Sequence, residues 1–221
     1  MTAGAVAGTA AGTVGGTVGE TRARRQVDRR AATTERLLDA TIECLAEDGY
    51  VATTTRRVAE RAGVSQGAQQ HYFPTKAALV DAAMVRLVEQ LLADAASRGL
   101  DVGTEHERAG ALLDLIWEIH HLPITPAVLE LFNVARTEPA LAQRVAEIVC
   151  GGMGEVQAIA AAVLPSYAGR AGFADFVQIA MATVRGTVLV ANIPGAAGAH
   201  PTWPVLRAHL LESLERLGSP A

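Results

Sequence analysis

Apolar residues recur at helical spacing along most of this 221-residue chain. In the N-terminal third, Leu38, Ile42 and Leu45 follow one another at intervals of four and three residues, which predicts a helix over about 31–48. A longer apolar run predicts a second helix over about 75–97. At roughly 1.5 Å per residue, this helix is about 35 Å long. It is long enough to connect two parts of the protein.

Prolines divide the remainder of the chain into shorter helical segments. Helices are predicted over residues 109–121, 125–136, 139–164, 173–192 and 204–217. Because a proline ring cannot sit in a continuing helix, Pro123, Pro139 and Pro165 mark the ends of the first three. Aromatic residues are few, whereas alanine and leucine are abundant, which favours packed helices over sheets. The pattern as a whole predicts an all-α fold.

Between the long helices, residues 53–76 predict two short helices joined by a tight turn. Thr54 can cap the first helix, and Gly63 supplies the left-handed residue that ends it. Ser65 can cap the second helix, which Pro74 stops. The second helix is about two turns long and rich in amide and imidazole groups. Such a helix is poor core material and is well suited to reading base edges in a DNA major groove.

Four motifs over residues 35–80 carry a resemblance to a known family. They are Asp48-Gly49-Tyr50 at the end of the first helix, Thr-Thr-Arg at the entry to the second, Ala-Gly-Val-Ser at the turn and Tyr-Phe-Pro-Thr-Lys before the fourth helix. In these motifs the chain resembles the TetR family of transcriptional repressors. The resemblance implies an N-terminal three-helix helix-turn-helix DNA-binding domain over 29–76. It also implies a helical ligand-binding and dimerisation domain over 77–221.

The same resemblance implies the residues that contact DNA. Gln66 and His71 are candidates for base contacts, and Arg56 is a third reader, since a guanidinium can bind a guanine edge or a phosphate in two-pronged fashion. Gln69 stands where the family usually has an apolar residue facing the core of the small domain, and Gln70 replaces a common aromatic residue. Local capping and solvation are the alternative roles. The expected DNA-binding residues are Thr54, Thr55, Arg56, Ser65, Gln66, Gly67, Gln70, His71, Tyr72 and Lys76.

Members of the family use the C-terminal domain to bind a small inducer, so a pocket is expected there. The candidate lining residues are Trp117, His121, Leu129, Phe132, Asn133, Met153, Gln157, Met181 and Arg185. For the apolar members of this set, ordinary core packing is an equally good interpretation. Asn133 and Arg185 are more informative, because a polar group on an apolar helix face needs a partner, which a ligand or an internal hydrogen bond can supply.

The last two predicted helices, 173–192 and 204–217, are more apolar than a monomer requires. By the resemblance they pair with their copies in a four-helix bundle between two subunits, and Leu210 and Leu214 are expected in that seam. The alternative is that both helices complete the core of one subunit. We expect a homodimer, because an operator read by this motif is normally a palindrome.

Charge is divided unequally along the chain. Residues 20–80 carry ten Lys and Arg against eight Asp and Glu, whereas residues 81–221 carry nine against fifteen. Five arginines precede the first helix within nine residues, so this arm is expected near DNA phosphates unless it is an ordinary solvated flank. The first nineteen residues are rich in Gly, Ala and Thr, and we expect residues 1–28 to form a disordered, basic arm.

Other classes of protein are less well supported. The longest apolar stretches are interrupted by Arg, Glu or Gln before the roughly 18–20 residues that a bilayer requires, so we expect no membrane partner and a cytoplasmic location. Cys44 and Cys150 have no metal-ligand spacing and are expected to be reduced, buried thiols, with a redox-sensing pair as the alternative. His120 and His121 cannot share one helix face. We therefore expect no catalytic residue, metal or cofactor.

Two functions remain open from the sequence. The first is a ligand-responsive, dimeric repressor that binds a palindromic double-stranded DNA operator and is released by a small-molecule inducer. The second is an all-helical small-molecule binding or enzymatic protein whose basic helix pair contacts a protein partner. Salt discriminates between them, because DNA binding through several phosphates weakens steeply as salt rises.

Overall fold

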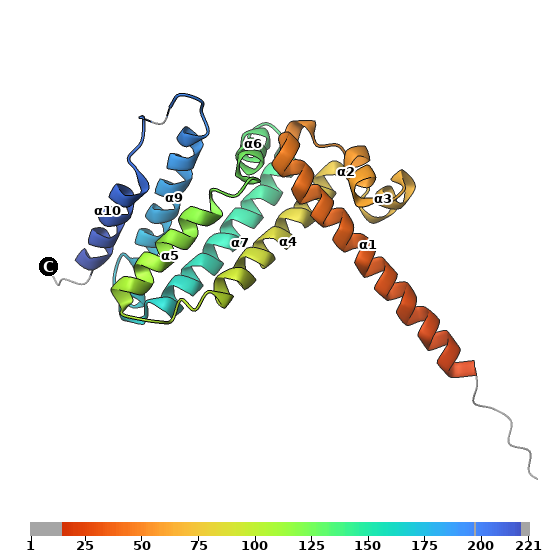
Figure 1. The fold of residues 1–221 in the computed structure, drawn as a ribbon, viewed down its shortest axis with the longest axis horizontal. Helices are drawn as coiled ribbons and strands as arrows, with labels where there is room; N and C mark the ends of the chain where they lie inside the picture. The colour runs from red at the N-terminus through yellow and green to blue at the C-terminus, as the bar shows by residue number, and fades with distance from the viewer. Residues whose placement is uncertain (1–14, 197, 218–221) are drawn as a thin grey trace, which may run out of the picture.

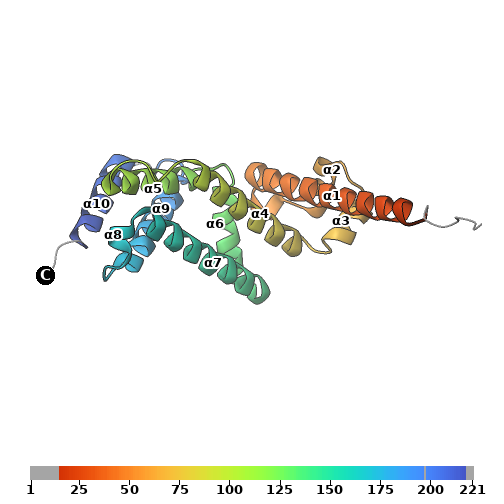
Figure 2. The same ribbon diagram turned by 90° about the horizontal axis from the view of Figure 1, so that it is seen from below.

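A computed structural model describes residues 15–196 and 198–217. Within these residues the chain forms ten helices and no strand, which confirms the all-α prediction. Figures 1 and 2 show an elongated molecule in which the first three helices lie at one end and the last helix at the other. The helix numbering below follows Figure 1.

The N-terminal end is a small helical bundle. Its helices are α1 (Gly15–Ala52), α2 (Thr55–Ala62), α3 (Gln66–Tyr72) and the first half of α4 (Lys76–Ser97). Leu37, Cys44, Val58 and Leu79 are almost completely buried where these helices meet. The predicted boundary at residue 76 thus coincides with the start of α4, but the apolar face of α4 continues the core of the small bundle.

The first helix begins earlier than the sequence predicted. α1 starts at Gly15, and Figure 1 shows it projecting well beyond the bundle, so residues 15–28 are helical and the prediction of a disordered arm is wrong for them. Residues 1–14 lie outside the described residues. The side chains from Gln26 to Ala32 are exposed, so burial does not explain the helical conformation of these residues. Residues 20–32 include alanine, arginine, glutamine and glutamate, which have good intrinsic helix propensity, whereas the three glycines among residues 15–19 do not.

The C-terminal part contains six further helices. They are α5 (Glu105–Ile119), α6 (Thr125–Ala135), α7 (Pro139–Val163), α8 (Pro165–Ala168), α9 (Phe173–Ala191) and α10 (Trp203–Arg216). Except for the one-turn α8, each was predicted within a few residues. α5 begins four residues earlier than expected because Thr104 and Glu107 form a capping box, in which each side chain bonds the backbone N–H of the other residue.

The core of the C-terminal part lies between α5, α7, α9 and α10. Val184 and Val188 of α9 are buried there, as are Leu210, Leu211 and Leu214 of α10. The expectation that Leu210 and Leu214 lie in a seam between subunits is therefore wrong, because both fill the core of a single chain. The apolar repeat could not separate these possibilities, since a helix that completes a core and one that joins two subunits have the same pattern.

Two helices are more apolar than the sequence argument allowed. Leu141–Val163 in α7 and Phe173–Ala191 in α9 are long and apolar enough to cross a membrane by length and composition. Polar residues interrupt both stretches, as predicted, but the inference that these interruptions exclude a span by composition is wrong, because a stretch of this kind tolerates one or two charges. The core helix of a globular protein has the same properties, and α9 is such a helix here. Cys44 is buried as predicted, whereas Cys150 on α7 is exposed.

Candidate nucleic-acid interface and ligand cavity

The two short helices are fixed by the capping residues that the sequence indicated. The Thr54 hydroxyl accepts a hydrogen bond from the backbone N–H of Arg57 at 3.2 Å, and Ser65 does the same for Ala68 at 3.2 Å. Gly63 ends α2 with φ of 65°, a left-handed conformation that favours glycine. The two caps and the glycine between them thus define where α2 begins and ends and where α3 begins.

The three arginines of α2 have different environments. Arg57 binds Asp48 of α1, with 3.0 Å from Nη2 to Oδ1, and Arg61 binds Glu47 of α1. These two guanidinium groups therefore tie α2 to α1. Arg56 points outward, and 80% of its side chain is exposed; its carboxylate contact is Glu60, one turn away and also exposed, at 3.5 Å. Arg56 is thus the arginine of α2 that is available to an external partner.

One face of α3 is polar and open. Gln66, Gly67, Gln70 and His71 are all exposed on this face. Gln69 points in the opposite direction and is completely buried, which is where the resemblance placed it. Its amide nitrogen donates to the Phe73 carbonyl at 2.7 Å, while Oε1 has no hydrogen-bond partner among the described residues. A buried amide oxygen without a partner costs about 1–3 kcal/mol of folding free energy, so Gln69 lowers the stability of the small bundle.

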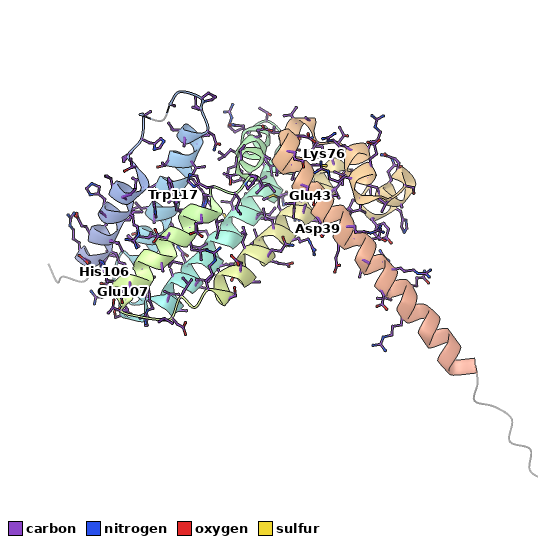
Figure 3. The ribbon with its side chains drawn as sticks, in the orientation of Figure 1. Asp39, Glu43, Lys76, His106, Glu107 and Trp117 are labelled. Carbon is purple, nitrogen blue, oxygen red and sulfur yellow. The ribbon has the colours of Figure 1, made fainter. Side chains whose placement is uncertain are left out.

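The remaining predicted DNA contacts are less exposed. Thr55 starts α2 and is half-buried, as is Tyr72, whose ring lies 5.9 Å from the Arg30 guanidinium carbon. Lys76 extends to the C-terminal end of α1, as Figure 3 shows. Its ammonium donates to the Tyr50 carbonyl at 2.5 Å and to the Val51 carbonyl at 3.3 Å. Burial lowers the pKa of this ammonium. Lys76 thus has an internal role that sequence reasoning missed.

A joint connects the end of α1 to α6. Glu130 of α6 accepts a hydrogen bond from the backbone N–H of Tyr50 at 2.7 Å. Gly49 makes this approach possible, since its φ is 76° and a Cβ atom there would lie 2.8 Å from the Glu130 carboxylate. The motif Asp48-Gly49-Tyr50 therefore does more than end a helix. It gives α6 a charged contact with the small bundle, and the sequence alone held no signal for Glu130 as the partner.

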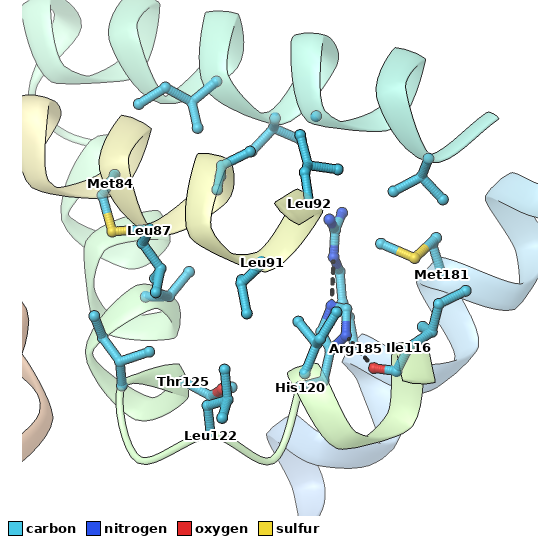
Figure 4. A pocket seen from close by; sticks show the side chains of 18 of the residues that line it. Met84, Leu87, Leu91, Leu92, Ile116, His120, Leu122, Thr125, Met181 and Arg185 are labelled. Atoms are coloured by element: carbon cyan, nitrogen blue, oxygen red, sulfur yellow. Dashed lines mark hydrogen bonds between the residues drawn. The ribbon is translucent and has the colours of Figure 1, made fainter. Parts of the chain in front are cut away.

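The C-terminal part encloses a cavity of about 230 Å³ that opens among α4, α5, α6, α7 and α9. Figure 4 shows its wall, in which Leu87, Leu91 and Leu92 come from α4 and Met181 comes from α9. Almost all of the wall is aliphatic. An apolar cavity with few polar groups is the usual form of a small-molecule site.

Four of the nine predicted lining residues lie in this wall: Leu129, Phe132, Met181 and Arg185. The other five lie elsewhere. Trp117 of α5 stacks on Trp203 of α10 at 4.6 Å between ring centroids, and the His121 ring lies 4.1 Å from the Trp117 ring, also between centroids. Asn133 is exposed, Met153 packs against the core of the C-terminal part, and Gln157 is half-buried outside the wall. The contribution of α4 to the wall was not predicted.

Two polar side chains meet inside the cavity. His120 Nδ1 lies 2.8 Å from the Ile116 carbonyl, so this nitrogen carries the proton and donates. The opposite nitrogen, Nε2, then accepts from Nε of Arg185 at 3.3 Å. Burial, followed by the charge of Arg185, lowers the pKa of His120 below its ordinary 6.5. His120 is therefore neutral at pH 7, and Arg185 is the charged group of the pair. Sequence reasoning assigned no ligand-binding role to His120.

Comparison with known proteins gives a consistent result. Residues 37–83 match the family described as bacterial regulatory proteins, tetR family. The chain is 32% identical over 126 residues to the HTH-type transcriptional regulator CymR of Pseudomonas putida, covering 57% of this chain and 62% of CymR. It is 39% identical over 74 residues to the HTH-type transcriptional repressor KstR of Mycolicibacterium smegmatis, covering 34% of this chain and 36% of KstR. These matches span less than two thirds of either relative.

The similarity to a solved structure extends further. The crystal structure of a transcriptional regulator from Rhodococcus sp. Rha1 superposes with a TM-score of 0.60 and 29% identity, covering 83% of this chain and 95% of that chain. The shared fold therefore includes the C-terminal helices as well as the helix-turn-helix.

Proposed function

Because this chain belongs to the tetR family of bacterial regulatory proteins, we propose that it binds a palindromic DNA operator as a homodimer and that a small-molecule inducer releases it. The observation that supports DNA binding most directly is the open polar face of α3 beside the exposed Arg56 of α2. Arg57 and Arg61 are held against α1, so Arg56 and the α3 side chains are the groups free to reach bases.

The dimer surface that we propose is the outward face of α9. Ile179, Ala182, Gly186 and Leu189 follow one another at intervals of three and four residues, and all are exposed on one subunit. Two large apolar residues at the ends and two small ones in the middle allow a partner helix to approach closely. This stripe fits a second copy of α9, because a two-fold interface is formed by the same patch on both subunits.

The cavity has two mechanical connections to the small bundle. α4 carries Leu79 in the core of that bundle and Leu91 in the cavity wall. α6 carries Phe132 in the wall and Glu130 at the joint with α1. A ligand that prefers one arrangement of α4 and α6 would change the distance between the two helix-turn-helix domains of a dimer. By linkage, the operator then weakens the ligand by the same factor as the ligand weakens the operator.

Selection from random double-stranded DNA tests this function. We expect the purified protein to enrich a palindromic sequence whose half-sites lie about one helical turn apart. Binding measured by fluorescence anisotropy should weaken steeply with salt, since each phosphate contact releases counterions from the DNA and so adds to the slope. Enrichment of no sequence, with salt-independent binding to a protein partner instead, would favour the alternative function.

A further inference from the structure

The cavity holds a charge that the chain itself does not neutralise. Within residues 15–196 and 198–217, Arg185 has no carboxylate within 4.0 Å, and its one hydrogen bond runs from Nε to His120. The terminal nitrogens of the guanidinium donate to no described protein group. Figure 4 shows the side chain extending past His120 into the cavity toward Leu92.

Resting on the proposed function of the cavity, we propose that its ligand is an apolar molecule with a single carboxylate, and that Arg185 binds this carboxylate through its two terminal nitrogens. A guanidinium presents parallel N–H groups that match the two oxygens of a carboxylate. Apart from His120 and Thr125, the remaining wall consists of apolar side chains such as Leu91, Ile116 and Met181, which fit an apolar body.

The alternatives to an anion are weaker on physical grounds. A buried cation without a counter-ion is unfavourable, and burial accordingly lowers the pKa of Arg185. A neutral ligand leaves that charge uncompensated, and a cationic ligand adds a second charge of the same sign. An anionic ligand alone removes the penalty, so the cavity selects for negative charge as well as for apolar surface.

His120 is a positioning residue in this site. Its Nδ1–H is held by the Ile116 carbonyl, which leaves Nε2 as an acceptor aimed at Arg185. That contact engages Nε, the guanidinium nitrogen nearest the side-chain stem. The two terminal nitrogens remain directed into the cavity, where the bidentate contact needs them.

Matched probes of one chain length test the inference. Octanoate, octan-1-ol and octylamine share an apolar body and differ in the charge of the head group. Isothermal titration calorimetry on the full chain should give octanoate about tenfold tighter binding than octan-1-ol, since hydrogen bonds between charged groups exceed neutral ones by roughly that factor. Octylamine should bind more weakly than either. The same comparison is made with hexanoate and hexan-1-ol and with decanoate and decan-1-ol, in case an eight-carbon chain does not match the length of the cavity.

Arg185→Met tests the residue. Methionine is apolar and of comparable length, so the variant removes a buried charge without adding one, and circular dichroism confirms that it folds. It should lose the preference for the carboxylate while still binding octan-1-ol. The matched control is Arg216→Met, an arginine on α10 whose side chain is 79% exposed and which lies outside the cavity wall. It should behave as the original protein.

Three results would overturn the inference. They are equal affinity for octanoate and octan-1-ol, a carboxylate preference that survives in Arg185→Met, and failure of all three carboxylates to bind. Repeating the titrations with the selected operator present separates this inference from the proposed function. Octanoate that binds through Arg185 but leaves operator affinity unchanged would support the ligand class and refute induction at this cavity.

Discussion

At the scale of single residues, neighbouring side chains of the same type have opposite roles. Arg56 is exposed, whereas Arg57 is paired with Asp48. Arg56→Ala should therefore weaken operator binding and flatten the preference at one base pair, with a loss of about 1–3 kcal/mol on the best sequence. Arg57→Ala is the control and should lower thermal stability with little change in base preference. Anisotropy against single-base operator variants measures both, and equal losses on all sequences for Arg56→Ala would contradict its assignment as a reader.

The environment of His120 predicts how the free energy of unfolding depends on pH. The folded-state pKa of His120 is lowered by burial and by Arg185, so the unfolded chain takes up a proton near pH 6.5 before the folded chain does. The free energy of unfolding should fall as pH drops from 7 toward the folded-state pKa, by at most about 1.4 kcal/mol per pH unit from this group. His120→Gln should flatten that part of the profile. Urea titrations at several pH values test it, and an unchanged slope in the variant would exclude His120 as the cause.

At the scale of elements, the joint between α1 and α6 depends on Gly49. Any other residue adopts φ of 76° only with strain, and its Cβ would press on Glu130. Gly49→Ala should therefore lower the free energy of unfolding by about 1–3 kcal/mol. The loss should be smaller when Glu130→Ala is already present, because the crowding is then removed. Denaturant unfolding of the two single variants and the double variant measures this, and strictly additive losses would show that the contact is not responsible.

Helix boundaries were predictable because they depend on residues adjacent in sequence. Thr54, Gly63, Ser65 and Thr75 each act within a few residues of their own position, and the structure finds all four at the predicted helix ends. The cavity was predictable only in part, because which way a side chain points depends on packing between distant helices. Trp117 and Asn133 have suitable chemistry and face elsewhere, whereas His120 lines the wall.

At the scale of the whole molecule, the structure shows which apolar residues fill the core of the chain and which remain at its surface. Ile179 on α9 is 59% exposed and lies in the apolar stripe that also contains Ala182 and Leu189. Ile179→Asp should therefore produce a folded monomer, since a charge in an apolar seam between subunits is costly unless it is paired. Val102→Asp is the control, because Val102 is 76% exposed and lies in the loop between α4 and α5, outside the α9 stripe. Sedimentation velocity decides, and an Ile179→Asp protein that sediments like the original would refute this interface.

The burial of Leu210, Leu211 and Leu214 inside one chain has a consequence for gene dosage. In the dimer that we propose, a subunit whose core is complete can separate from its partner without unfolding, so dissociation would not by itself remove the protein from the cell. If only pairs of chains bind an operator, occupancy at low expression rises with the square of the chain concentration. A modest change in synthesis or degradation of this protein would then sharply change occupancy of the proposed operator, even at a constant concentration of the proposed inducer.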